Sequence, residues 1–231
     1  SYGRGFRSPQ ARGLQDGAVA PLTRADTVEV GTHLGRIPWL DLRVAFFYTF
    51  VANELVFDHV SAKFLASGST RRIGGELVTE FTPLRWLRIE ADLTYADGRY
   101  EATGEPIPYA PRLLVAWGLY AAHSANVSRG PASGAPFSLS AGLRSWVLGP
   151  RPLPEDLVAD PTWTADLVGE MALGPLFVQL QVDNLFGQKW RDGEFVFPSC
   201  FDPTAACSAL PVRHITAGSP QALHVLVGAR L

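Results

Sequence analysis

The side chains that could carry out acid–base or metal chemistry are scattered along this chain. Its histidines fall into no HExxH or comparable metal-binding spacing; they are His33, His59, His123, His214 and His224. The chain also has no GxSxG nucleophile motif. Most arginines and carboxylates instead occupy alternate positions within apolar stretches. The sequence therefore predicts no catalytic or metal site, and we expect a protein that is not an enzyme and holds no cofactor.

The two cysteines, Cys200 and Cys207, lie close together in a polar segment that contains proline. Their spacing is not CxxC, and further zinc ligands are not nearby. A disulfide closing so short a loop in an oxidising compartment would contribute about 2–3 kcal/mol by chain entropy. The sequence thus predicts a Cys200–Cys207 disulfide, and the alternative is two unpaired thiols.

The elements that position the charged residues are predicted to be β-strands. Residues 86–95 show the pattern best: Leu87, Ile89, Ala91, Leu93 and Tyr95 fall on one face, and the residues between them are charged or polar. A soluble sheet would hide the apolar face against a core. A membrane barrel would turn it to lipid and the charged face to a wet lumen.

About ten antiparallel strands are expected in one unit, at residues 1–7, 24–34, 39–57, 68–82, 86–99, 110–122, 136–148, 161–173, 175–188 and 221–231. Short connections at 35–38, 82–85 and 173–175 alternate with longer ones at 8–23, 58–67, 98–109, 149–160 and 189–220. The connection at 123–135 is long although it falls on the short side. Short periplasmic turns and long extracellular loops are typical of outer-membrane barrels. The pattern therefore predicts an all-β, antiparallel transmembrane β-barrel whose last strand ends at the periplasmic side.

Composition is consistent with this fold class and excludes others. The 231 residues carry 20 basic and 22 acidic side chains, a net charge of −2, which argues against nucleic acid as a partner. The sequence contains no apolar run of about 18 residues, so no transmembrane helix is predicted. Aromatic residues near the expected strand ends indicate interfacial girdles; they are Trp39, Trp86, Tyr95 and Trp163. Charged residues on the opposite face would line the lumen; they are Arg43, Arg72, Arg88, Arg144, Glu76, Glu80, Glu90, Asp92, Asp166 and Glu170.

Several stretches, in order along the chain, carry a family resemblance. They are YGRGFRSP at 2–9, FFYT followed by NELV within 46–56, RRIGGEL at 71–77, PYAPR at 108–112, LGPRPL at 148–153, and VDNLF with WRD within 182–192. Together they resemble the C-terminal half of the β-barrel of a TonB-dependent outer-membrane receptor. Two positions depart from the family pattern: the closing stretch reads Gly-Ser-Pro-Gln at 218–221, and the last residue is Leu231 rather than an aromatic.

The resemblance implies that residues 1–231 are the C-terminal portion of a barrel of about 22 strands, without the plug and the N-terminal strands. An open half-barrel would leave two unpaired edges in lipid. The implied function is uptake of a scarce ligand, such as an iron–siderophore, cobalamin, haem or a carbohydrate. The implied partners are the plug and N-terminal barrel half in the same or a separate chain, the TonB–ExbB–ExbD complex acting through the plug, outer-membrane lipid and lipopolysaccharide, and the small-molecule ligand.

By the same resemblance, residues on the extracellular loops could touch the ligand: Arg99, Tyr100, Tyr109, Arg151, Trp190, Phe195, Phe197 and Arg213. Packing of one loop against another is the alternative for each of them. Other interpretations of the whole chain are a self-contained ten-stranded outer-membrane barrel that acts as a protease or adhesin, and a soluble β-sandwich. If the apolar face meets lipid, Ile89→Arg should cost about 2–4 kcal/mol at mid-bilayer.

Overall fold

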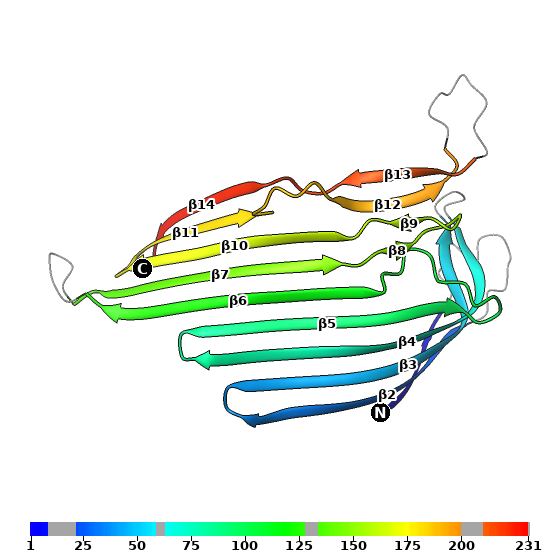
Figure 1. The fold of residues 1–231 in the computed structure, drawn as a ribbon, viewed down its shortest axis with the longest axis horizontal. Coiled ribbons are helices and arrows are strands. Elements are labelled where there is room, and N and C mark those ends of the chain that lie inside the picture. Colours follow the sequence, from blue (N-terminus) through cyan, green and yellow to red (C-terminus); the bar gives the residue numbers. More distant parts are fainter. Residues whose placement is uncertain (9–21, 59–62, 128–133, 200–209, 231) are drawn as a thin grey trace, which may run out of the picture.

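Ten antiparallel strands form one curved sheet in the computed structural model, which describes residues 1–8, 22–58, 63–127, 134–199 and 210–230 (Figure 1). The strands follow chain order, and the sheet runs β1-β2-β3-β4-β5-β6-β7-β10-β11-β14. Their bounds are β1 Tyr2–Arg7, β2 Thr23–Ile37, β3 Leu40–Asp58, β4 Lys63–Leu84, β5 Leu87–Tyr100, β6 Leu113–Asn126, β7 Pro136–Leu148, β10 Thr162–Leu173, β11 Leu176–Asp183 and β14 Ala222–Ala229. This confirms the ten expected strands. Strands β1 and β14 are the two edges, so the sheet is not closed.

The two ends of the sheet differ in their connections, as the sequence predicts. Turns at residues 38–39, 85–86 and 174–175 join strands at one end, which we call the turn end. The longer segments gather at the other end, the loop end, except for the connection from β6 to β7, which leaves the sheet at the turn end, where Asn126 pairs with Pro136 (Figure 1). Strand β14 finishes at the turn end, where the Arg230 amide donates a 2.7 Å hydrogen bond to the Pro175 carbonyl.

Three of the expected loops contain strands, which corrects the prediction. Asp58 and residues 63–67 continue the β3–β4 hairpin, in which Asp58 pairs with Lys63 beyond a bulge at Asn53. The segment 149–160 contains β8 (Arg151–Pro152) and β9 (Val158–Ala159), and the segment 189–220 contains β12 (Arg191–Phe197) and β13 (Val212–Ala217). The β8–β9 and β12–β13 pairs lie outside the main sheet, where the apolar–polar alternation that identifies its strands is interrupted.

The register aligns the apolar positions of neighbouring strands on one face. Val30 pairs with Phe46, Phe46 with Gly75, Gly75 with Tyr95, and Tyr95 with Leu113. Residues that lie directly opposite one another share a face, so these positions form one row. Along β5 the apolar positions run from Leu87 to Tyr95, about nine residues, which matches a tilted transmembrane strand. We call this surface the apolar belt.

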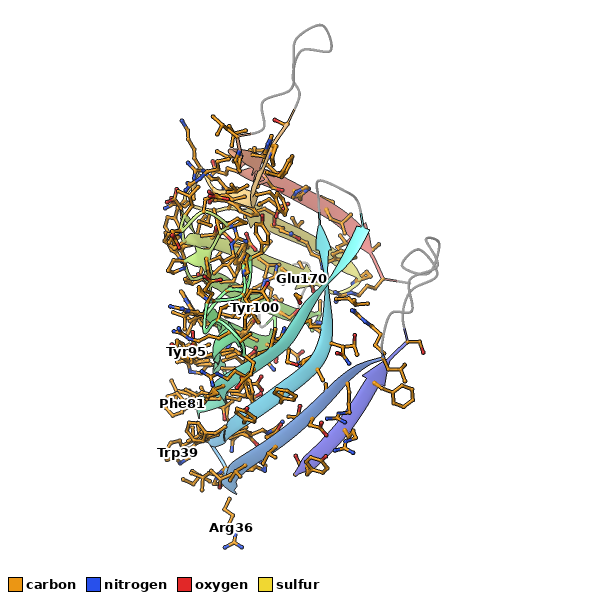
Figure 2. The ribbon with its side chains drawn as sticks, turned by 90° about the vertical axis from the view of Figure 1, so that its right-hand side faces the viewer. Arg36, Trp39, Phe81, Tyr95, Tyr100 and Glu170 are labelled. Atoms are coloured by element: carbon orange, nitrogen blue, oxygen red, sulfur yellow. The ribbon has the colours of Figure 1, made fainter. Side chains whose placement is uncertain are left out.

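The apolar belt is exposed in the chain by itself. Val30 is 70% exposed, Phe46 67% and Val227 71%. In the view along the strands, Trp39, Phe81 and Tyr95 lie on the convex side of the sheet and Glu170 lies on the concave side (Figure 2). Large apolar side chains that face outward from a single layer are expected where lipid covers them.

Aromatic side chains mark both margins of the apolar belt. At the turn end, Trp39 packs edge-on against Phe81 with ring centroids 5.6 Å apart. At the loop end, Trp163 stacks on Phe186 at 5.3 Å. The Trp163 indole Nε1 donates a 2.7 Å hydrogen bond to Ser145 Oγ, which itself donates to the Thr164 carbonyl. Both polar groups on this outward face are therefore satisfied, as a low-dielectric environment requires.

The buried apolar cluster found in the described residues lies within the loops, not beneath the sheet. Leu153, Ala159 and Val196 form it, with Tyr109 packed against them. Within the described residues, no helix is long and apolar enough to cross a membrane.

Candidate functional site

The concave face of the sheet carries charged and polar side chains at every strand. The register places all ten predicted lumenal residues on this face, for example Glu90 opposite Gly118, and Gly118 opposite Arg144. Several of these residues have polar partners on the same face: Arg88 contacts Glu90 at 3.2 Å, and Glu170 accepts hydrogen bonds from Arg230 and Gln179, both at 2.7 Å. The strands therefore present a polar inner wall.

Hollows interrupt the inner wall, and two of them have charged linings. One, of about 330 Å³, has three carboxylates and one arginine in its lining: Glu90, Asp92, Asp166 and Arg144. The other, of about 450 Å³, is lined by a mixed set that includes Glu29, His33, Arg43 and Glu76. Charged surfaces of this kind can hold a polar partner by hydrogen bonds and ion pairs.

The floor of the first hollow depends on two glycines that face Tyr120. A Cβ added at Gly118 would lie 2.6 Å from the Tyr120 ring, and one added at Gly142 would lie 2.9 Å from it. The ring therefore lies against bare backbone of its own strand, β6, and of the neighbouring strand β7, and the Arg88 guanidinium sits 4.9 Å from its centroid. This packing holds Arg88 on the inner wall, and the alternation pattern did not reveal it.

The neighbouring candidates Arg99 and Tyr100 lie on opposite faces near the end of β5. Arg99 faces outward, where Nε contacts Asp97 at 2.7 Å and Nη1 donates to the Gly104 carbonyl at 3.1 Å. Tyr100 faces inward, toward the Glu54–Arg72 ion pair of 2.6 Å. Burial, followed by the nearby carboxylates Glu54 and Glu105, raises the pKa of Tyr100. Its hydroxyl therefore stays protonated at neutral pH and can donate a hydrogen bond.

Asn184, in the VDNLF stretch, ties together the segments that follow β11 and precede β14. Its side-chain Nδ2 donates to the carbonyls of Gln188 and Ser219, and its Oδ1 accepts from the Gln188 amide. Its own amide donates to Asp166 at 2.9 Å. Asn184 is buried and has a φ of +48°, a conformation that asparagine tolerates better than most residues. The motif therefore fixes where the long β11–β14 connection leaves the sheet.

Trp190, another candidate, is held by the same connection. Its Nε1 donates to the Ser219 carbonyl at 3.1 Å, and its ring meets Trp146 edge-on at 5.4 Å. A Cβ at Gly218 would overlap the indole, so this glycine makes room for it. The two tryptophans connect the inner wall to the loops above it.

Three further candidates come together around the buried apolar cluster of Leu153, Ala159 and Val196, a region of the loops that we call the loop cap. Tyr109 packs against Phe195 at 5.7 Å, and its hydroxyl exchanges hydrogen bonds with the Val196 backbone. The Tyr109 amide donates to the Pro152 carbonyl, directly after Arg151. Arg213 donates to the Val158 carbonyl at 3.2 Å. Packing of loop against loop, the alternative reading, thus accounts for the positions of Tyr109, Phe195 and Arg213.

A buried carboxylate, which the sequence did not single out, organises the polar side of the loop cap. The Glu194 side chain has no exposed surface; it contacts Arg191 at 2.9 Å and Arg213 at 3.3 Å, and accepts from the Asp160 amide at 3.1 Å. Arg191 also contacts Asp160 at 2.7 Å. Glu194 thereby joins β12, β13 and the segment after β9. A charged residue within the apolar run at 194–197 was the available signal.

The two remaining candidates, Phe197 and Arg151, differ in their contacts. Phe197 stacks on His214 with centroids 3.8 Å apart. Arg151 has a buried Nη2 that finds no hydrogen-bond partner within the described part of the chain. An unpaired buried donor is costly, so this nitrogen is suited to an acceptor brought by a ligand.

Cys200 and Cys207 lie outside the described residues, so their disulfide stays a prediction. Among the residues that are described, no group of three or more His, Cys, Asp or Glu side chains is placed to hold a metal ion. The arrangement offers binding surfaces: a polar inner wall, a loop cap and an apolar outer face.

Comparisons with known proteins agree with this geometry. Residues 1–185 match the family described as TonB dependent receptor-like, beta-barrel. A comparison with curated proteins found no match.

Similar solved structures include three receptors or transporters. The ferric yersiniabactin uptake receptor FyuA from Yersinia pestis is 14% identical, with a TM-score of 0.69 over 97% of this chain and 33% of its own. The ferric-catecholate import receptor Fiu from E. coli is 18% identical, with a TM-score of 0.63 over 98% and 31%. The copper transporter OprC is 17% identical, with a TM-score of 0.69 over 98% and 35%.

The chain spans about a third of the length of these structures. At such identities the likeness shows the fold, an arc of a larger barrel, while the family match rests on most of the chain. This chain therefore belongs to the TonB-dependent receptor β-barrel family, whose members are outer-membrane proteins.

Proposed function

We propose that this chain forms part of the wall of an outer-membrane receptor that takes up a scarce ligand with energy supplied through TonB. The observation that supports this most is the division of one open sheet into an apolar outer face and a charged inner wall. The named ligands of the similar structures, ferric yersiniabactin, ferric catecholate and copper, favour a metal ion or metal chelate over a carbohydrate or cobalamin.

The open edges support completion of the barrel by further strands. Strands β1 and β14 each have one side without a partner strand in the described sheet. Backbone N–H and C=O groups left unpaired in lipid cost several kcal/mol each, so both edges need strands from the same or a separate polypeptide. The completed lumen would hold a plug against the inner wall, and the TonB–ExbB–ExbD complex would act on that plug.

Ligand contact is proposed for the loop end, with Arg151 as the first residue to test. Its unpaired Nη2 could donate to an anionic or carbonyl oxygen of a metal chelate. Tyr100 and Trp190 border the inner wall and could contribute a hydroxyl and a ring face. No covalent step is needed, and we propose a binding role without catalysis.

A self-contained protease or adhesin is not favoured. Such a barrel would have to close through its own first and last strands, and β1 does not pair with β14. The family match covers β1 to the end of β11 and points to a transport receptor.

Energy-dependent uptake by cells tests the proposal. Cells that carry the receptor containing this chain would be given a radiolabelled ferric catecholate, a ferric hydroxamate, haem and cupric ion, with and without TonB. We expect TonB-dependent accumulation of at least one probe, weakened at least tenfold in apparent affinity by Arg151→Gln, because a charge-assisted hydrogen bond is lost. Accumulation that is unaffected by loss of TonB would refute the transport proposal.

A matched variant separates binding from folding. Arg36 is exposed at the turn end, far from the loops, so Arg36→Gln removes the same charge without touching the loop cap. Uptake by this control should equal that of the unaltered receptor. Equal uptake by Arg151→Gln would remove Arg151 from the ligand site and leave the transport proposal standing.

A further inference from the structure

The hairpin of β12 and β13 has two outer edges, and the described residues satisfy them differently. On the β12 edge, the Val196 amide donates to the Tyr109 hydroxyl, which in turn donates to the Val196 carbonyl. Val196 lies opposite Arg213. Backbone groups alternate between the two sides of a strand, and both members of such a pair turn them the same way, out of the hairpin. The N–H and C=O groups of Arg213 therefore lie on the outer edge of β13.

The same alternation identifies the other backbone groups on the outer edge of β13. The Gly218 amide donates to the Trp190 carbonyl at 2.9 Å, so even-numbered residues from 212 to 218 turn their backbone groups toward β12. Those of Arg213, Ile215 and Ala217 point the opposite way. Within the described part of the chain, β13 has a strand beside it on the β12 side alone. Its outer edge is therefore available to a further strand.

The sequence of β13 favours pairing on both sides. It reads Val-Arg-His-Ile-Thr-Ala, with three β-branched residues and neither lysine nor proline. Natural free edges are usually protected by lysine, by proline or by a bulge, and the bulge of this hairpin lies on β12. The charge of Arg213 is directed to Glu194. Ile215 is 52% exposed and Val212 41%, and an extended segment added to this edge would cover both side chains.

The strand that completes the barrel is the partner that the topology brings to this edge. Strand β13 leads into β14, and the two lie along the same side of β12 and β11 (Figure 1). Strand β14 runs from the loop end to the turn end, so an antiparallel strand on its free edge runs toward the loop end. Such a strand leaves the lipid beside residues 218–221 and reaches β13 next.

We propose that the strand completing the barrel against β14 continues beyond the lipid and pairs with β13, as the third strand of a sheet with β12. The inference rests on the proposed completion of the barrel by further strands. Lipid requires that the edge of β14 be paired, but it makes no such demand on β13, which lies in the aqueous region. Because Glu194 joins β13 to the loop cap, the added strand ties the loop cap to the rest of the receptor.

Amide exchange resolved at single residues, measured on the detergent-extracted receptor that contains this chain, tests the pairing. The Thr216 amide faces β12 and should be protected whether or not a further strand is present. The Arg213 and Ile215 amides should also exchange more slowly than their intrinsic rates, by about tenfold or more, because the added strand accepts their hydrogen bonds. Exchange of these two amides at intrinsic rates, with Thr216 protected, would overturn the proposal.

A photo-cross-link identifies the segment that covers the edge. The cross-linking residue p-benzoylphenylalanine would replace Ile215 in β13 or Val225 in β14, and mass spectrometry would identify the joined peptides. Both positions should cross-link to one continuous stretch of sequence. The control replaces Met171 on β10, which is 50% exposed and lies two strands from the free edge, and it should give no such cross-link. A cross-link from position 215 to the segment between β12 and β13, or to a separate protein that does not pair with β14, would overturn the proposal.

The cross-links separate this proposal from completion of the barrel and from uptake. A cross-link from position 225 to another barrel strand, with none from position 215, would support the completed barrel and overturn the pairing with β13. The absence of a strand cross-link from either position would contradict both. Neither result depends on transport, so the uptake proposal is judged by the TonB assay alone.

Discussion

Replacing an alanine by arginine on either face of the sheet gives a direct test of which face meets lipid. Ala91 on β5 lies on the apolar belt, midway between Leu87 and Tyr95. Ala116 on β6 lies opposite Asp92, on the inner wall. The two alanines are on neighbouring paired strands at nearly the same depth. Ala91→Arg and Ala116→Arg are therefore the same chemical change on opposite faces.

The expected magnitudes follow from depth. An arginine on the lipid face of a barrel costs about 2–4 kcal/mol at the midplane and about 0–1 kcal/mol near the interfaces. Ala91 is central, so we expect about 2–4 kcal/mol. Ile89 is one outward position closer to the turn end, about 5 Å in depth for a strand tilted by about 40°, so Ile89→Arg should cost somewhat less. Ala116 borders the hollow that contains Glu90, Asp92 and Asp166, and an arginine there should cost under about 1 kcal/mol.

Denaturant unfolding in lipid vesicles measures these differences. The complete receptor, refolded into vesicles, would be titrated with guanidinium chloride and followed by tryptophan fluorescence. Equal destabilisation by Ala91→Arg and Ala116→Arg would refute the assignment of the convex face to lipid. A larger cost for Ala116→Arg would reverse the two faces.

Three further predictions concern the loops and the paired strands β1 and β2. Glu194→Gln keeps the shape of the side chain but removes the charge that Arg191 and Arg213 share; because both arginines are about one-third exposed, we expect about 1–2 kcal/mol of lost local stability. Faster amide exchange in β12 and β13 would show it, with the exposed Glu155→Gln as control, and unchanged exchange would contradict it. Asn184→Ala removes three buried side-chain hydrogen bonds and should loosen the β11–β14 connection by about 2–4 kcal/mol in the same assay, whereas Asn184→Asp, which keeps the Gln188 amide bond, should cost less. The hydrogen bond from Arg4, and after it the one from Tyr2, holds the pKa of Asp26 below its ordinary value of 3.8. The Asp26 carboxylate therefore contributes stability that is fully present above pH 3.8 and is lost as the pH falls through the lowered pKa. Amide protection of β1 and β2, corrected for intrinsic rates, should thus be constant from pH 8 to 5 and fall below pH 3.8, and Asp26→Asn should abolish that fall.

The main sheet was predictable because its two environments impose a strict period of two. In β3, shifting the register by one residue would move Phe46 and Tyr48 to the inner wall and Arg43 to lipid. The alternation in each strand therefore indicates which of its residues face lipid and which face the inner wall. The alternating short and long connections between the ten strands indicate their order in the sheet. The family motifs add the size of the complete barrel, which the period alone does not contain.

The loop end was predicted less well because water surrounds it on several sides. Strand β12 packs Glu194 and Val196 inward, one polar and one apolar, so its pattern has no consistent apolar face. The β3–β4 hairpin continues past the bulge at Asn53, beyond the height at which lipid demands alternation. Arg99 and Tyr100 are adjacent in sequence, yet the strand turns one outward and the other inward. Proximity in the chain could not show which of them borders the inner wall.

A loop arginine can bind a ligand more readily when its N–H groups do not already have partners within the protein. Arg213 and Arg191 both contact the buried Glu194 carboxylate. A ligand that bound either arginine would have to break one of these charge-assisted hydrogen bonds and form another of equal strength. Arg151 differs, because its buried Nη2 has no hydrogen-bond partner within the described residues, and a ligand oxygen placed there would remove a cost of about 1–3 kcal/mol that the loop cap carries without it. In the proposed ligand site, the loop cap would keep its shape through Glu194 while Arg151 binds the ligand. Substitution of Arg151 should therefore weaken uptake with little effect on amide exchange in β12 and β13. Substitution of Glu194 should instead speed up amide exchange in these two strands.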